Sequence, residues 1–215
     1  MKERGMIFNG EMVRALFNGR KTQTRRPVKF PVHDKNLGCE LAGNELAGEL
    51  SAGNYLNSAF GKPGDRIWVR EAYRFPASLD DVSPTGVGEM AVATGYRKPW
   101  APTFYEFTGT FSDGWKGFET SPKVSDAGKL RPSIHMPRWA CRILLEITDV
   151  RVERLKSISD RDALREGCSA ADMKSGDCVA DVFARLWASI YGSDSWNANP
   201  WVWVIEFKRV EGGAA

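Results

Sequence analysis

The sequence predicts an α+β fold: a small mixed β-barrel with helices packed outside it. Segments of alternating hydrophobicity are interleaved with segments that have helical periodicity and capping residues. Their order is strand, helix, basic loop, strand, insertion, strand, helix, helix, strand, which lacks the regular alternation of a parallel doubly wound sheet. Glycine-rich stretches at about 33–60 and 77–132 are predicted to be insertions. The 215 residues then form one domain, 1–215, enlarged by these two segments.

The first strand is predicted at residues 6–8 and is followed by a short helix. Asn9 is a favourable cap for this helix, and Gly19 suits its left-handed end. Its apolar positions are Val13, Leu16 and Phe17. Residues 33–60 are predicted to be a surface loop with helical turns.

Residues 20–29 form a basic stretch with five cations and no acidic residue. Charge alone is equally typical of a solvated loop. A helix-end glycine before the stretch and Pro27 within it indicate a loop held in place, which can aim side chains at a ligand. Neighbouring cations disfavour the protonated form of Lys21, so it is a candidate base or nucleophile, and the Thr24 hydroxyl lies within reach of it. The candidate ligand-binding cations are Arg20, Arg25 and Arg26.

The second strand is predicted at residues 66–73, where side chains alternate in character. Arg70 and Glu71 fall on opposite faces, so one of them is expected to face the interior, where a charge needs a partner. Lys21 or Arg26 could pair with Glu71, and a plain ion pair at the barrel mouth is an equal alternative. Residues 103–111, inside the second insertion, are expected to form one or two strands.

A strand at 141–152 changes phase near residues 148–149, which indicates a bulge. Ser159 is predicted to cap a helix that ends at Gly167, and Asp177 to cap a longer one closed by Gly192. The last strand is expected at 201–210, apolar on both faces at first.

Two further residues are candidates for stacking on a base. Arg138 and Trp139 place a cation next to an aromatic ring, a combination that favours nucleobases, although a core position explains Trp139 better.

Composition excludes several classes of protein. No apolar run approaches the ~20 residues of a membrane span, and no signal-peptide core follows the N-terminus, so a cytoplasmic protein is expected. A net charge of +3 argues against general phosphate binding and leaves room for one local basic site. The four cysteines and two histidines form no close-spaced pair, so neither a metal nor another cofactor is predicted, and reduced thiols are expected.

An ordered set of motifs resembles the ASCH domain family, a relative of the PUA RNA-binding domains. The set is Gly19-Arg20-Lys21-Thr22-x-Thr24, Gly64-Asp65 before a strand, Asp162-Ala163-x-x-Glu166-Gly167, and the final Trp203-Val-Ile-Glu-Phe strand. The segment at 133–139 resembles versions encoded by bacteriophages and prophages. The resemblance spans residues 6–210, with the two insertions outside the shared core.

The resemblance implies a PUA-like β-barrel with a cleft that takes RNA, single-stranded nucleic acid or a modified nucleoside. One bacterial branch removes the acetyl group from N4-acetylcytidine with a lysine, a threonine and a glutamate, which match Lys21, Thr24 and Glu166. Without the resemblance, Glu166 is better explained as a solvent-exposed residue near a helix C-terminus. This chain departs from that branch in being about twice as long and in carrying Arg25-Arg26-Pro27.

Three functions therefore compete at this stage. The first is an amide hydrolase in which Lys21 activates the Thr24 hydroxyl and Glu166 moves a proton to the leaving amine. In a variant of it, Lys21 stabilises the oxyanion and Glu166 activates water. The second is a non-catalytic RNA- or DNA-binding module, and the third is a metal-independent ribonuclease that uses the same basic cleft.

Overall fold

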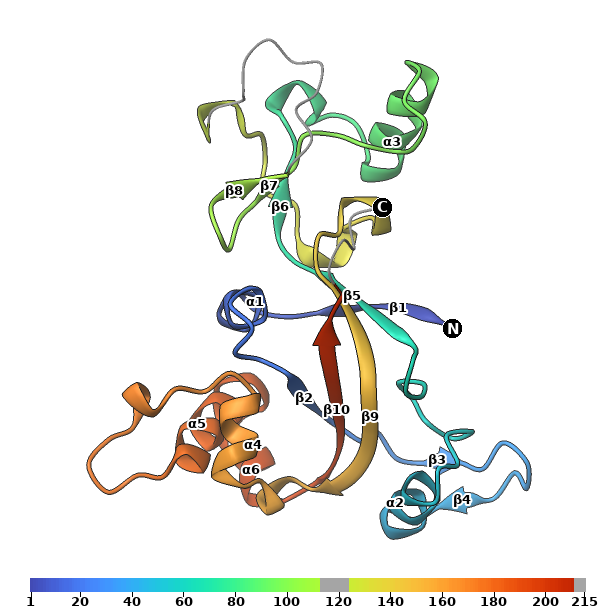
Figure 1. The fold of residues 1–215 in the computed structure, drawn as a ribbon, viewed down its shortest axis with the longest axis vertical. Helices are drawn as coiled ribbons and strands as arrows, with labels where there is room; N and C mark the ends of the chain where they lie inside the picture. Colours follow the sequence, from blue (N-terminus) through green and yellow to red (C-terminus); the bar gives the residue numbers. More distant parts are fainter. Residues whose placement is uncertain (113–123, 211–215) are drawn as a thin grey trace. The chain divides into compact units, whose positions relative to one another are not determined.

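The computed structural model describes residues 1–112 and 124–210, and its elements confirm the α+β class (Figure 1). The strands are β1 (Glu3–Ile7), β2 (Gln23–Pro27), β3 (Val32–His33), β4 (Glu40–Leu41), β5 (Arg66–Arg70), β6 (Tyr73–Arg74), β7 (Phe104–Tyr105), β8 (Thr110–Phe111), β9 (Leu144–Arg154) and β10 (Trp201–Arg209). The α-helices are α1 (Gly10–Phe17), α2 (Gly43–Ser51), α3 (Pro84–Ala93), α4 (Asp160–Arg165), α5 (Val179–Tyr191) and α6 (Ser193–Asn197).

The largest sheet has five strands in the order β1-β5-β9-β10-β2. Its outer strands, β1 and β2, do not pair with each other within the described residues, so the sheet is open and no closed barrel is seen. Two smaller sheets are formed by β3-β4 and by β6-β7-β8.

The chain divides into two compact units, each built from separate stretches of sequence. The first unit comprises Met1–Lys2, Ala15–Arg66 and Glu146–Arg209. The second comprises Glu3–Arg14, Ile67–Leu145 and Val210–Ala215, of which 113–123 and 211–215 lie outside the described residues. The expected single domain with two insertions stays a prediction.

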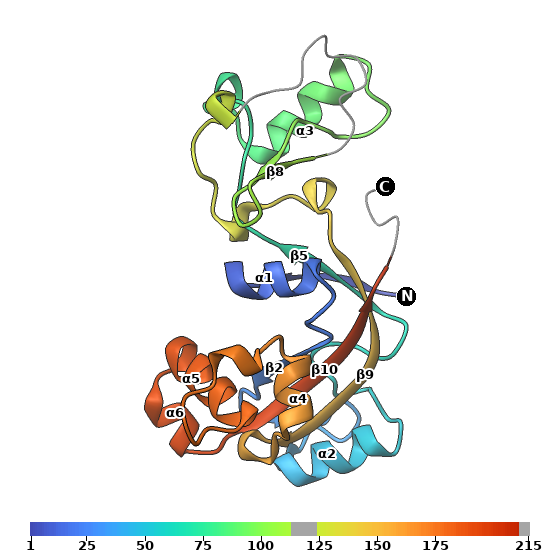
Figure 2. The ribbon, with the colours of Figure 1, turned by 60° about the vertical axis from the view of Figure 1, so that its left-hand side comes forward.

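In the first unit, helices cover one face of β2 and β10. Val202 and Val204 of β10 pack with Phe183 and Trp187 of α5, and α4, α5 and α6 gather on this side of the strands (Figure 2). The opposite face is covered by residues of the first insertion: the Phe60 ring meets Trp203 edge-on, with centroids 5.8 Å apart. We call these the helix face and the insertion face.

Most predicted elements are confirmed, with shifts of a few residues at their ends. The Asn9 side chain caps α1 by accepting a hydrogen bond from the Met12 N–H, and Ser159 and Asp162 form the expected capping box of α4. The predicted bulge agrees with the burial along β9, in which Ile147 and Val150 are both buried although they lie three residues apart. The longer helix is capped one residue later than expected, at Cys178.

The prediction of a loop at the basic stretch is wrong in part, and the prediction of a loop with helical turns at residues 33–60 is confirmed in part. Half of the basic stretch is strand β2, which pairs antiparallel with β10 and tolerates the buried Arg25 because ion pairs with Glu153 and Glu166 neutralise its charge. The first insertion holds the expected helical segment, α2, and also the β3-β4 strand pair, which was not expected. The second insertion holds α3, which the sequence analysis missed, and the expected strands β7 and β8; residues 113–123 of this prediction lie outside the described residues.

The described residues hold no helix that is both long and apolar enough to cross a membrane. All four cysteines are free thiols, as expected.

The first residue of α2 packs so closely against β10 that no side chain fits there. A Cβ atom on Gly43 would lie 2.3 Å from Trp201 Nε1, whereas one on Gly48 of the same helix would meet nothing within 4 Å. We expect Gly43→Ala to lower the free energy of unfolding by about 1–3 kcal/mol through overpacking. Gly48→Ala should raise it by about 0.5–1 kcal/mol. Urea denaturation of both variants measures the difference; equal effects would contradict this packing.

Candidate functional site

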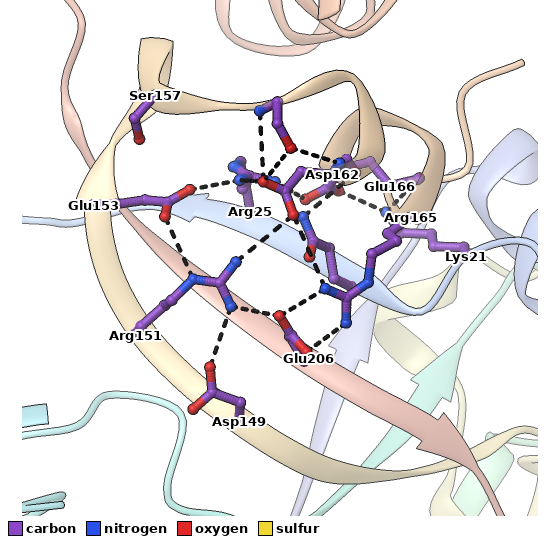
Figure 3. A network of polar contacts seen from close by, with 12 residues as sticks. Lys21, Arg25, Asp149, Arg151, Glu153, Ser157, Asp162, Arg165, Glu166 and Glu206 are labelled. Carbon is purple, nitrogen blue, oxygen red and sulfur yellow. Dashed lines mark hydrogen bonds and ion pairs between the residues drawn. The ribbon is translucent and has the colours of Figure 1, made fainter. Parts of the chain in front are cut away.

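A network of charged side chains joins β2, β9, β10 and α4 on the helix face of the first unit (Figure 3). Its cations are Lys21, Arg25, Arg151 and Arg165, and its carboxylates are Asp149, Glu153, Asp162, Glu166 and Glu206. The network has a buried inner part around Glu166 and a partly exposed outer part around Glu206.

The end of α1 and the start of β2 position Lys21. Gly19 adopts a left-handed conformation with φ +71°, and the backbone N–H of Lys21 donates to the Ala15 carbonyl at 3.1 Å. The next residue, Thr22, donates its N–H to the Arg165 carbonyl at 2.8 Å. These bonds anchor both sides of Lys21 and turn its side chain toward the end of α4.

Lys21 and Glu166 form a buried ion pair. Lys21 Nζ donates to Glu166 Oε2 at 2.8 Å and to the Glu166 backbone carbonyl, also at 2.8 Å. The two side chains are 0% and 1% exposed. The alternative reading of Glu166 as a solvent-exposed helix end is therefore wrong, because the residue after α4 turns back into the unit.

Gly167 makes this close approach possible. Its φ of +96° is a conformation that residues with a side chain rarely adopt, and a Cβ there would lie 3.0 Å from Ala15 Cβ and 3.3 Å from Lys21 Cβ. The structure thus explains why a glycine follows Glu166: Gly167 ends α4 and lets the Glu166 side chain reach Lys21.

Arg25 occupies the second oxygen of Glu166. Its Nη1 donates to Glu166 Oε1 at 3.1 Å, and its Nη2 donates to Glu153 Oε1 at 2.5 Å. Asp162 Oδ2 lies 3.6 Å from the same Nη2. The Arg25 side chain is fully buried, so Glu166, itself almost fully buried, contacts two buried cations, and the partly exposed Glu153 gives Arg25 a second carboxylate.

The outer part of the network is centred on Glu206. Arg151 Nη1 donates to Glu206 Oε1 at 2.6 Å, and Arg165 binds both Glu206 oxygens. Burial alone would raise the pKa of Glu206, but the hydrogen bonds and charges of the two arginines outweigh it and lower that pKa. These side chains are 18–33% exposed, so each pair contributes little to stability.

The network neutralises two of the five cations of the basic stretch, Lys21 and Arg25. Four cations face five carboxylates, and both Lys21 and Arg25 are withdrawn from solvent. For Arg25 this differs from the sequence-based expectation that its charge is presented to a ligand. Arg20 is exposed, and its Nη1 donates to the Gly167 carbonyl at 3.3 Å.

Burial changes the acid–base character of Lys21. The loss of solvation lowers its pKa below the usual value, and the nearby Glu166 carboxylate opposes this only in part. The Arg26 charge lowers it further. The expected lowering is confirmed in direction, but its main cause is burial and not repulsion within the stretch.

Thr24 leaves β2 on the other side. In the register of β2 with β10, Arg25 lies opposite Val204 on the helix face, and Thr24 lies opposite Ile205. Because successive side chains of a strand point to opposite faces, Thr24 and Arg26 belong to the insertion face with Trp203. Both hydrogen bonds of Lys21 Nζ go to Glu166. The structure therefore brings together two members of the predicted catalytic set, and places the Thr24 hydroxyl on the opposite face.

The remaining predicted residues belong to the second unit. Glu71 is fully buried and forms a two-pronged ion pair with Arg142, at 2.8 Å from Nε and 2.7 Å from Nη2. Arg142 is thus a partner of Glu71 that the sequence analysis did not name. Arg142 also binds the hydroxyls of Thr108 and Thr110.

Arg70, Arg138 and Trp139 contact residues of the second unit. The Arg70 guanidinium lies 4.5 Å from the Trp68 ring centre, and Arg138 Nε donates to Glu3 at 2.9 Å. Trp139 is half-buried and stacks on Phe75 with ring centroids 5.5 Å apart. This packing supports the core reading of Trp139 over a base-stacking role.

Sequence reasoning missed most carboxylates of the network and the arginine partner of Glu71. Arg151 and Glu153 are two residues apart in β9, and Glu206 is a lone acid in the apolar strand β10. Charges at such alternating positions, facing another charged strand, are the signal that could have indicated a buried ion network.

Comparisons with known proteins give no family assignment. No family model matches the chain, and no curated protein matches it. One solved structure is similar, that of protein EF3133 from Enterococcus faecalis V583, described as a member of the family DUF984. It shares 9% identity and a TM-score of 0.39 over 98% of this chain and 81% of its own.

The inner network predicts unequal effects of removing its two ends. Lys21→Met leaves Glu166 paired with Arg25, whereas Glu166→Gln leaves the buried Lys21 without its carboxylate and leaves Arg25 to Glu153. We expect Glu166→Gln to lower the free energy of unfolding by about 3–5 kcal/mol and Lys21→Met to lower it by clearly less. Chemical denaturation measures both, with Lys29→Met, an exposed lysine nearby, as the control. A larger effect of Lys21→Met would contradict the arrangement.

Proposed function

We propose that this protein is an ASCH-type hydrolase that cleaves an amide on a modified pyrimidine nucleoside such as N4-acetylcytidine. The observation that carries the proposal is the buried contact of Lys21 Nζ with Glu166 Oε2 at 2.8 Å, between two residues that match the catalytic lysine and glutamate of the resembling branch. A titratable pair shielded from water is typical of catalytic sites. The same resemblance supports a PUA-like barrel, a nucleic-acid-related partner, a cytoplasmic location and a phage or prophage type.

Lys21 suits the role of a general base. A neutral amine has two N–H groups and one lone pair, so it can keep both hydrogen bonds to Glu166 and still accept a proton. The lowered pKa of Lys21 increases the fraction of this neutral form at working pH. Glu166 also accepts a hydrogen bond from Arg25 and acts in this proposal by orienting the amine.

Water is the nucleophile that this arrangement favours. The Thr24 side chain leaves β2 on the insertion face, away from the bonds that Lys21 makes. The proposed mechanism therefore uses Lys21 and Glu166, and its nucleophile is a water molecule in place of the Thr24 hydroxyl.

The proposed reaction has two proton transfers. Lys21 takes a proton from water while the water oxygen bonds to the acyl carbon, which gives a tetrahedral oxyanion. The ammonium of Lys21 then donates that proton to the amide nitrogen as the carbon–nitrogen bond breaks. The products are acetate and the free amine of cytidine.

Access to the pair passes through the outer network. Lys21 and Glu166 are almost completely buried, whereas Arg151, Arg165 and Glu206 are partly exposed. Because partly exposed ion pairs are weak, the substrate can displace them at small cost.

A second candidate function, a nucleic-acid-binding module, is favoured by one surface feature. The exposed Arg154 lies with its guanidinium 4.4 Å from the centre of the Trp201 ring. Arginine and tryptophan together are suited to stack on bases of single-stranded nucleic acid. The ribonuclease alternative has no comparable observation beyond the Lys21–Glu166 pair.

Activity of purified protein on N4-acetylcytidine tests the first proposal. We expect wild type to release cytidine and Lys21→Met to lose about 100-fold or more in kcat/KM, as removal of a general base does. The rate should rise with pH as Lys21 loses its proton. Lys29→Met is the matched control and should retain the wild-type rate.

Thr24→Val separates the two nucleophiles in the same assay. Valine has the shape of threonine without its hydroxyl, so water attack predicts a rate within about threefold of wild type, and threonine attack predicts a loss as large as that of Lys21→Met. Inactive wild-type protein, or full activity of Lys21→Met, would refute the hydrolase. Cleavage of single-stranded RNA in EDTA would favour the ribonuclease instead.

A further inference from the structure

Two buried polar atoms of β2 on the helix face find no hydrogen-bond partner among residues 1–112 and 124–210. They are Gln23 Oε1, an acceptor, and Arg25 Nε, a donor. Gln23 is 0% exposed and the Arg25 side chain is fully buried. Leaving a buried polar atom unpaired is unfavourable, and such atoms in a folded protein call for an explanation.

The rest of each side chain is firmly held. Gln23 Nε2 donates to the Asp162 carbonyl at 3.4 Å, which assigns Oε1 as the free end of the amide. The same carbonyl accepts the Glu166 N–H at 2.8 Å, so Gln23 lies against the last turn of α4. Arg25 is fixed through its Nη atoms by Glu153 and Glu166.

The two atoms share a side of one strand. Gln23 and Arg25 are two residues apart in β2, about 7 Å along the strand, and both side chains point to the face that holds the Lys21–Glu166 pair. Gln23 Oε1 thus offers a hydrogen-bond acceptor, and Arg25 Nε offers a donor, on the same side of β2. The group that matches them carries a donor and an acceptor of its own, and a secondary amide does so through its N–H and C=O.

We infer that Gln23 Oε1 and Arg25 Nε receive the scissile amide, with the substrate N–H bound by Gln23 and its carbonyl oxygen bound by Arg25. This inference rests on the proposed hydrolase and adds its specificity: the site selects amides that carry an N–H. The Arg25 Nε–H also lies where it can stabilise the oxyanion that forms on that carbonyl. Gln23 and Arg25 are otherwise outside the set of residues that the resemblance assigns to catalysis.

The test compares two probes, N4-acetylcytidine and its N4-methyl derivative, which lacks the N–H. We expect wild type to prefer N4-acetylcytidine by on the order of 100-fold or more in kcat/KM, because a site built to bind an N–H rejects the analogue without it. Gln23→Met keeps the length of the side chain and removes the acceptor, so it should abolish this preference. The preference is a ratio within one preparation and does not depend on the fraction of folded protein.

Arg25→Lys provides the complementary variant. Both probes carry the carbonyl, so loss of the Nε–H should lower kcat/KM for the two probes by the same factor and leave the preference unchanged. If Gln23→Met keeps the wild-type preference, Gln23 Oε1 binds only a structural water and the inference is overturned.

Binding to the Lys21→Met protein separates failure of this inference from failure of the proposed hydrolase. Calorimetric titration with each probe should show tighter binding of N4-acetylcytidine, and the added Gln23→Met change should remove the difference. Inactive wild type with this binding preference intact would refute the hydrolase alone. No binding of either probe, or equal binding of both, would overturn the inference.

Discussion

The first unit depends on one constraint: two buried cations share one buried carboxylate. Glu166 receives Lys21 on one oxygen and Arg25 on the other, and all three side chains are almost without solvent contact. A buried charge is tolerated only when it is paired and hydrogen-bonded. The end of α4 is therefore fixed against β2, and Gly167 is needed to bring the two chains that close.

The inner part of the network is shielded from water and the outer part is partly exposed. This difference in solvent exposure gives the two parts different roles in the proposed reaction. The inner part lowers the pKa of Lys21 through burial. In the outer part, Arg151 and Arg165 lower the pKa of Glu206 by contacts that stay accessible to water. A substrate that enters from the outer side would exchange weak ion pairs for contacts with Lys21, Gln23 and Arg25, which are already held in place.

Local signals in the sequence were sufficient to predict most of the helices and strands, and of the site they indicated Lys21 and Glu166. Capping residues and hydrophobic periodicity located α1, α4, α5 and β10, because these depend on neighbours in the chain. Strand β2 could not be predicted in this way, since its charges are compensated by residues such as Glu153 that lie more than a hundred positions away. The face of Thr24 likewise depends on the register with β10, which the sequence does not display.

The protonation state of Lys21 tests most directly whether this residue can act as a general base. Nuclear magnetic resonance of the lysine side chains, with Lys21→Met to assign the signal, gives its pKa in the folded protein. We expect a value below the usual 10.5, because burial outweighs the attraction of Glu166. A pKa at or above 10.5 would mean that Lys21 is a permanent cation in a structural ion pair, and it would contradict its role as a base.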